Sequence, residues 1–138
     1  MKILLDSDVL LDVLADRQPF VAPSSAAWAL AEPKRYEAVI SALSFTNIYY
    51  VGRKLFGHAK AMEAMQSLSS IFEIAPVDRH VIDSAISSGL PDFEDAVQAF
   101  AAASAGATHV VTRDARGFVG GPLAMVPPDQ LPALLAGG

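Results

Sequence analysis

The chain of 138 residues has no cysteine, few positive charges and no long apolar run. Without cysteine it can form neither a disulfide framework nor a thiolate metal site, and a cytoplasmic location is expected. The most apolar stretch, residues 96–111, is interrupted by polar residues and a glycine. Because a membrane span needs roughly 18 consecutive apolar residues, the sequence predicts no transmembrane helix and no membrane partner.

Basic residues are also scarce: 10 Lys and Arg face 15 Asp and Glu, for a net charge of -5 at pH 7. This balance gives no support to nucleic-acid binding through a basic surface. A nucleic-acid partner would have to be held by a bound cation or by local basic residues. The three histidines have no spacing typical of a set of metal ligands.

What the sequence does contain is an alternation of short apolar, β-branched runs with helical patterns. Strands are predicted at residues 3–5, 36–41, 72–76, 108–112 and 123–126. Helices are predicted from 6 to about 17, from 23 to 32 with Ser24 or Ser25 as the cap, and then at 44–55, 58–71, 78–88, 92–105 and 128–136. The alternation predicts a single domain over residues 1–138, built as a three-layer α/β/α sandwich around a central, mostly parallel sheet.

The most informative segment is PDFEDAVQAFAAASAGATHVVTRDARGF, residues 91–118. Asp92 precedes an apolar-periodic helix as a natural N-cap, and Asp95 follows three residues later in the capping-box position. Gly106 ends this helix before a buried strand. Asp114 then lies just past the carboxyl end of that strand, where open α/β sheets bind ligands.

Three acids are therefore expected to converge at one edge of the sheet: Asp6 after the first strand, Asp95 and Asp114. Carboxylates so close together repel one another and raise each other's pKa values unless a cation is present. Mg²⁺ or Mn²⁺ suits such oxygen ligands and retains open water positions. The chemistry that follows most directly is hydrolysis of a phosphodiester by a metal-activated water.

Other acids nearby have structural interpretations beside the functional one. Asp92 suits a helix cap as well as a site residue, and Glu94 suits a solvated first-turn acid as well as a metal ligand. Asp8 is a candidate substrate-binding residue or a helix cap, and Asp12 is expected at the surface.

Polar and aromatic residues raise the same choice. Thr112 and Arg113 flank Asp114 and are candidates to position a phosphate, although Arg113 also suits the rim of a site. Tyr49 and Tyr50 lie at helical spacings typical of a core or a dimer interface, more than of a platform for bases.

The segments ILLDSDVLLDVLADRQPF, SALSFTNIYYVGRK and DFEDAVQAFAAASAGATHVVTRDARGF together resemble a PIN domain, of the branch whose third motif reads DFEDA. The resemblance implies a Mg²⁺-dependent ribonuclease that prefers single-stranded RNA, often the VapC-like toxin of a bacterial toxin–antitoxin pair. It also implies a homodimer and an antitoxin partner. By this resemblance Asp6, Asp95 and Asp114 match the first, third and fourth acids, and Asp92 and Glu94 match acids of the branch.

One position departs from the family pattern. Many PIN nucleases have a glutamate in the second motif, where this chain has Asn47. An amide does not neutralise a metal as a carboxylate does, so Asn47, Asp92 or Glu94 would have to complete the ligand shell.

Two alternatives remain open from the sequence alone. A PIN fold with a weakened active site would act as a binding module, and Asn47 favours that interpretation. A phosphohydrolase of the haloacid dehalogenase type is a more distant alternative. It would use Asp6 as nucleophile and Asp8 as acid or base, but the later motif and lysine of that family are not found.

Overall fold

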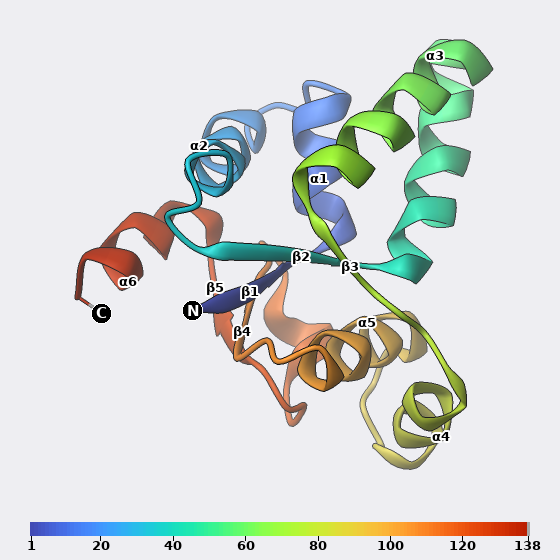
Figure 1. Ribbon diagram of the computed structural model, residues 1–138, viewed down its shortest axis with the longest axis vertical. Helices are drawn as coiled ribbons and strands as arrows, with labels where there is room; N and C mark the ends of the chain where they lie inside the picture. Colours follow the sequence, from blue (N-terminus) through green and yellow to red (C-terminus); the bar gives the residue numbers. More distant parts are fainter. Residues whose placement is uncertain (138) are drawn as a thin grey trace.

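The computed structural model describes residues 1–137 as one α/β/α sandwich around a five-stranded sheet (Figure 1). The strands are β1 (Lys2–Leu5), β2 (Glu37–Ser41), β3 (Glu73–Ala75), β4 (His109–Val111) and β5 (Ala124–Val126). The helices are α1 (Ser7–Leu14), α2 (Val21–Ala31), α3 (Ala42–Ile71), α4 (Arg79–Ser87), α5 (Phe93–Ser104) and α6 (Leu131–Gly137), with short 3₁₀ turns η1 (Ala115–Phe118) and η2 (Pro128–Gln130). The predicted sandwich is confirmed, and all four strand pairings are parallel.

The strand order is β3-β2-β1-β4-β5, so the chain reverses its direction of winding between β1 and β4. β1 pairs with β4 through Leu4 and Val110, and the Asp6 amide extends that ladder by donating to the Val111 carbonyl at 3.1 Å. A reversal of this kind opens a crevice at the carboxyl ends of the two strands. The residues that follow β1 and β4 therefore meet there.

Alternating side chains of β1 pack into two separate cores. Ile3 and Leu5 belong to the core under α1, α2, α3 and α6, whereas Leu4 belongs to the core under α4 and α5. Figure 1 shows these two groups of helices on opposite sides of the sheet. All three side chains are fully buried, as expected for a parallel sheet covered on both faces.

Three helix boundaries differ from the prediction. The last helix, α6, begins at Leu131, because residues 128–130 form the 3₁₀ turn η2. α1 ends at Leu14, and Asp16 takes a left-handed conformation with φ of 52°. α2 begins at Val21, because Pro23 fits within the first turn, where backbone amides have no intrahelical acceptor. The predicted cap Ser24 is instead fully buried within the helix, and its hydroxyl binds Asp12.

The two predicted middle helices run together as α3 with a break at Gly57, whose φ is 87°. Such a conformation favours glycine. None of the helices in the described chain is both long enough and apolar enough to span a membrane.

Candidate active site

Asp6 stands at the start of α1 but does not cap it. Its backbone is extended, as at an N-cap, yet its side chain makes no capping hydrogen bond. The carboxylate instead accepts a hydrogen bond from the Thr112 hydroxyl at 2.9 Å. Burial raises the pKa of Asp6 to about 6, although the bond from Thr112 works against this shift. The fold thus holds a buried carboxylate that its own helix does not use.

Asp95 stands in the first turn of α5, and Asp92 positions it. The Asp92 carboxylate accepts from the Asp95 amide at 2.9 Å, which confirms Asp92 as the N-cap of α5. Burial raises the pKa of Asp95 to about 7, helped by the negative charges of Asp6 and Asp92, and then of Glu94 and Asp8. Because the charge of Asp6 contributes to the raised pKa of Asp95, the two carboxylates lie close enough to interact electrostatically.

A cleft of about 340 Å³ opens where the N-terminal halves of α1, α3 and α5 meet. Its lining combines four acids, two other polar residues and three apolar or aromatic residues: Asp6, Asp8, Glu94, Asp95, Ser7, Asn47, Leu11, Tyr50 and Val51. The structure therefore brings together five of the predicted site residues, Asp6, Asp8, Asn47, Glu94 and Asp95.

The two outer acids of the cleft are less confined. Asp8 is exposed and forms an ion pair with Arg17 at 3.3 Å. Glu94 has a pKa raised first by partial burial and then by Asp92 and Asp8. Both side chains add negative charge at the mouth of the cleft.

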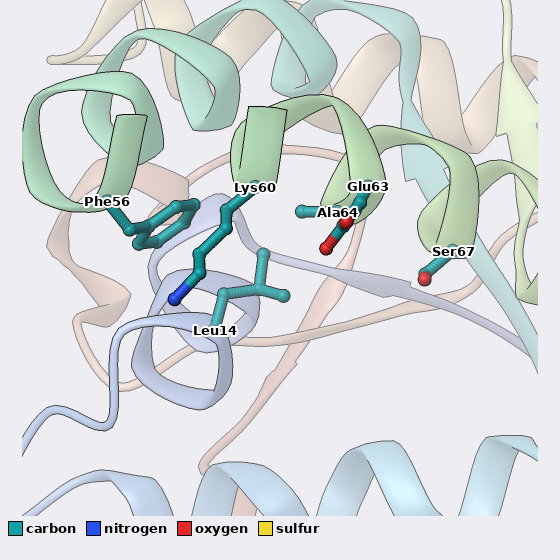
Figure 2. A pocket seen from close by; sticks show the side chains of 6 residues that line it. All are labelled: Leu14, Phe56, Lys60, Glu63, Ala64 and Ser67. Carbon is teal, nitrogen blue, oxygen red and sulfur yellow. The ribbon is translucent and has the colours of Figure 1, made fainter. Parts of the chain in front are cut away.

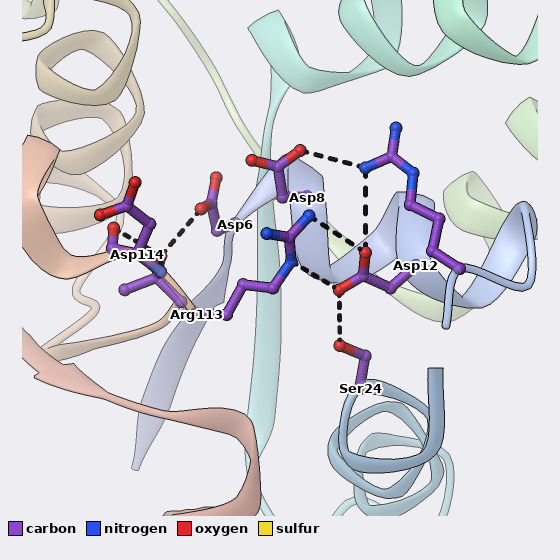
Figure 3. A network of polar contacts seen from close by, with 8 residues as sticks. Asp6, Asp8, Asp12, Ser24, Arg113 and Asp114 are labelled. Carbon is purple, nitrogen blue, oxygen red and sulfur yellow. Dashed lines mark hydrogen bonds and ion pairs between the residues drawn. The ribbon is translucent and has the colours of Figure 1, made fainter. Parts of the chain in front are cut away.

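Asp114 lies beyond this lining, at the turn after β4. Its carboxylate caps η1 and is bound by Arg116 through two bonds, Nε to Oδ1 at 2.9 Å and Nη2 to Oδ2 at 2.8 Å. These bonds lower the pKa of Asp114 to about 2. Thr112 connects the turn to Asp6, because its hydroxyl lies 3.0 Å from the Asp114 carbonyl and 3.1 Å from the Asp114 amide. Figure 3 shows the carboxylates of Asp6 and Asp114 pointing to the same side.

Arg113 points elsewhere. Its guanidinium binds the Asp12 carboxylate, with Nε 3.0 Å from Oδ2 and Nη2 3.3 Å from Oδ1 (Figure 3). It also stacks over the Phe20 ring, 4.0 Å from the centroid. Asp12 is fully buried, so the prediction of a surface residue is wrong. Its partners, Arg113 and the Ser24 hydroxyl, come from distant parts of the chain, and no local pattern reveals them.

Asn47 and Gln98 supply amides around the carboxylates. Asn47 lines the cleft, and its Nδ2 is buried without a hydrogen-bond partner among the described residues. Gln98, one turn after Asp95, is fully buried beneath Asp6 and lowers the pKa of that carboxyl. Its Oε1 accepts from the Ser44 hydroxyl at 3.3 Å, and Ser44 in turn accepts from Ser7 at 2.7 Å. Gln98 was not predicted, although a glutamine within the apolar face of a helix is a signal for it.

The donor set of the cleft fits a hard divalent cation. The ligand atoms on offer are carboxylate and amide oxygens, which Mg²⁺ and Mn²⁺ prefer. Burial, and then neighbouring carboxylates, raise the pKa values of Asp6 and Asp95, so a cation in the cleft would stabilise their charged forms. Within residues 1–137, however, no three acidic or histidine side chains are grouped closely enough to hold a metal ion by themselves. Water, Asn47 or a rotated Asp114 would have to complete the shell.

A second hollow, of about 380 Å³, lies between the end of α1 and the second half of α3. Figure 2 shows Lys60 and Leu14 beside it, with Glu63 as its one carboxylate. Because a single acid with a neighbouring lysine does not suit a divalent cation, the cleft at Asp6 and Asp95 is the better candidate for catalysis.

Comparison with solved structures shows the same fold in three bacterial proteins. VapC20 of Mycobacterium tuberculosis, described as a toxin that cleaves the sarcin-ricin loop, is 15% identical with a TM-score of 0.67 over 82% of this chain and 90% of that chain. VapBC2 of Rickettsia felis, bound to a DNA fragment from its promoter, is 16% identical with a TM-score of 0.70 over 92% and 98%. FitAcB of Neisseria gonorrhoeae is 20% identical with a TM-score of 0.70 over 94% and 99%.

At the level of sequence, no curated protein is significantly similar to the chain. A family model does match: the model of the PIN domain aligns with residues 2–116, from β1 through the turn that carries Asp114. The matched region contains the whole cleft and most of the sheet. The chain therefore belongs to the PIN domain family.

Proposed function

We propose that this protein is a ribonuclease that depends on Mg²⁺ or Mn²⁺ and acts as the toxin of a toxin–antitoxin pair. The single observation that carries the proposal is the placement of Asp6 and Asp95 in one cleft, each with a raised pKa, in a member of the PIN family. The structural likeness to a toxin described as cleaving the sarcin-ricin loop supports RNA as the substrate. A cytoplasmic location accompanies this proposal.

In this function some residues of the chain would bind the cation, and others would fix the orientation of those ligands. Asp6 and Asp95 would hold the cation, with Asn47, Glu94 or Asp114 as further ligands and Asp92 fixing the helix start that carries Asp95. Thr112 keeps the Asp6 carboxylate oriented through its 2.9 Å hydrogen bond. When bound, the cation supplies Lewis-acid stabilisation of the charge that develops on a phosphodiester.

The test is cleavage of a mixed single-stranded RNA in Mg²⁺ or Mn²⁺, comparing the wild type with Asp6→Asn and Asp95→Asn. Each substitution removes one negative charge from the cleft while keeping nearly the same shape. Asp129→Asn is the matched control, because Asp129 is exposed on η2 and does not line the cleft. Loss of metal-dependent cleavage in the first two variants but not in the control would support the proposal. A folded wild type that neither cleaves RNA nor binds Mn²⁺ in a titration would contradict it.

A binding module without catalysis is the second candidate. Asn47, which stands in the cleft in place of an acid, favours this candidate. So does the ion pair of Arg116 with Asp114, because it engages a carboxylate that would otherwise be open to a cation. This candidate predicts RNA or protein binding that Asp6→Asn leaves unchanged. The haloacid dehalogenase alternative loses its support, because the family match covers the same opening motif.

Partners are part of the same proposal. A solved structure described as a toxin–antitoxin complex from Klebsiella pneumoniae shares this fold, with 19% identity and a TM-score of 0.67 over 91% of this chain and 97% of that chain, which supports an antitoxin as a protein partner. A homodimer is proposed through the exposed apolar side chains of α3, Leu55, Met62 and Ile71. The mass in solution tests the dimer, and co-purification of an untagged product of a neighbouring gene tests the antitoxin.

A further inference from the structure

Tyr50 is an exposed aromatic residue inside the candidate active site. It lines the cleft together with Asp6 and Asp95, and 59% of its surface is accessible. Of the two expected places for Tyr50, a core or a dimer interface, its exposure contradicts the core. Its ring therefore offers an open face beside the paired carboxylates of the cleft.

The residues that line the cleft are of two chemical kinds. Asp6, after β1, and Asp95, in the first turn of α5, are acidic, whereas Tyr50 and Val51 of α3 and Leu11 of α1 are aromatic or apolar. A nucleotide has the same division, with a charged phosphate and a flat, largely apolar base. With the proposed cation held by the acids, one nucleotide could present its phosphate to that cation and its base to the aromatic and apolar side chains.

The Tyr50 ring has a defined neighbour. Tyr49 meets it edge to face, with centroids 5.7 Å apart, and the Tyr49 hydroxyl is hydrogen-bonded to His58 Nδ1 at 2.8 Å. Tyr49 also meets the His58 ring edge to face at 5.8 Å. Because His58 follows the break at Gly57, this contact ties the two halves of α3 together behind Tyr50.

Charge also favours a contact of this type. Asp6, Asp8, Glu94 and Asp95 make the cleft acidic, and the chain as a whole has a net charge of -5. Phosphates receive no general attraction from such a surface, so part of the binding energy must come from contacts that do not depend on charge. Stacking of bases on aromatic rings is of this kind and is open only to unpaired bases.

We propose that Tyr50 is the stacking platform for an unpaired base of the nucleotide whose phosphate lies at Asp6 and Asp95. This inference rests on the proposed function, since it names the part of the substrate that the same cleft recognises. It makes Tyr50 a substrate-binding residue and gives the protein a physical reason to prefer single strands. A base in a duplex is stacked on both faces and is not available to the ring.

The experiment compares Tyr50→Ala and Tyr50→Phe with the wild type, using a short single-stranded RNA of mixed sequence and a duplex of the same sequence. Base stacking is worth enough that Tyr50→Ala should raise KM for the single strand about 5- to 150-fold, with kcat nearly unchanged. Tyr50→Phe keeps the ring and should stay within about twofold of the wild type. Ile86→Ala is the matched control, because Ile86 is a similarly exposed apolar side chain on α4, outside the cleft lining and outside the proposed dimer face.

A second readout does not need turnover. In Tyr50→Trp, combined with Trp28→Phe to remove the other indole, addition of the single-stranded RNA should quench the fluorescence of the new Trp, and the duplex should not.

The outcomes separate the two proposals. Wild-type cleavage with equal KM for Tyr50→Ala and Ile86→Ala overturns the role of Tyr50 and leaves the ribonuclease standing. A change of oligomeric mass in Tyr50→Ala without a change in KM also overturns it and assigns Tyr50 to an interface. A wild type that neither binds nor cleaves RNA overturns both.

Discussion

The pair formed by Arg113 and Asp12 allows a quantitative test of how the turn after β4 is held. Asp12 is fully buried on α1, and Arg113 binds it through two nitrogen atoms while keeping about a quarter of its own side chain exposed. Replacing Arg113 with methionine preserves most of the aliphatic stem but leaves a buried carboxylate without its main partner. Such a loss typically costs 3–5 kcal/mol.

Two neighbours reduce this cost. The Ser24 hydroxyl still donates to Asp12 at 3.0 Å, and Arg17 lies 3.8 Å from the other oxygen. We therefore expect Arg113→Met to lower the free energy of unfolding by about 3 kcal/mol, at the lower end of the range. For a chain of this length, that is a fall of about 10 °C in Tm.

Urea unfolding measures the change, with Arg79→Met as the control. Arg79 pairs with Asp83 at 3.8 Å, but both side chains are mostly exposed, so its loss should cost less than about 0.5 kcal/mol. The double variant Asp12→Leu with Arg113→Met should recover much of the stability, because no buried charge remains. If Arg113→Met were no more damaging than Arg79→Met, the idea that this ion pair anchors the turn would be refuted.

Three further predictions concern the cleft itself. The pKa values of Asp95 and Asp6 are raised in the folded state, so the metal-free folded protein binds more protons than the unfolded chain between about pH 4 and 7. Its Tm should therefore fall as the pH rises through that window. Asp95→Asn removes one of these groups and should make the fall of Tm less steep. Gly117→Ala would drive a methyl group into the Asp95 carboxylate and should weaken Mn²⁺ binding at least about tenfold by calorimetry, whereas Gly137→Ala, with open space around it, should not. Asn47→Glu adds a carboxylate to the cleft and should strengthen Mn²⁺ binding while lowering the stability of the metal-free protein; equal Mn²⁺ affinity would show that position 47 does not reach the cation.

The sequence predicted the elements whose signals are local. Asp92 caps α5, and Gly106 follows that helix with a φ of 99°, because both depend only on neighbouring residues. The apolar run at Ile3 to Leu5 predicted a buried strand for the same reason. Asp6 and Asp114 were expected at one edge because residues at the carboxyl ends of parallel strands share it, and Asp95 was added to them as the start of the helix that leads into β4.

What the sequence did not reveal depends on partners far along the chain. Asp12 has the helical position of a surface residue, and its burial depends chiefly on Arg113, 101 residues later, with help from Ser24 and Arg17. Tyr50 was assigned to a core or a dimer interface because periodicity gives the face of a helix but not what covers it. How much of that face of α3 is exposed depends on how α1 and α5 pack beside it, and a local sequence pattern carries no information about that packing.

The turn after β4 carries two arginine–aspartate pairs that differ in burial, and the difference decides how each acts. Arg113 binds a fully buried carboxylate, so releasing it would leave a charge away from water, and the pair fixes the backbone on either side. Arg116 binds Asp114 at the surface, where both groups regain water when they separate and where salt weakens their attraction. The carboxylate of Asp114 is thus held by a surface ion pair, while Thr112 keeps the backbone of the turn in place. If the proposed cation binds beside Asp6, opening the pair with Arg116 would free Asp114 to join Asp6 and Asp95 as a ligand.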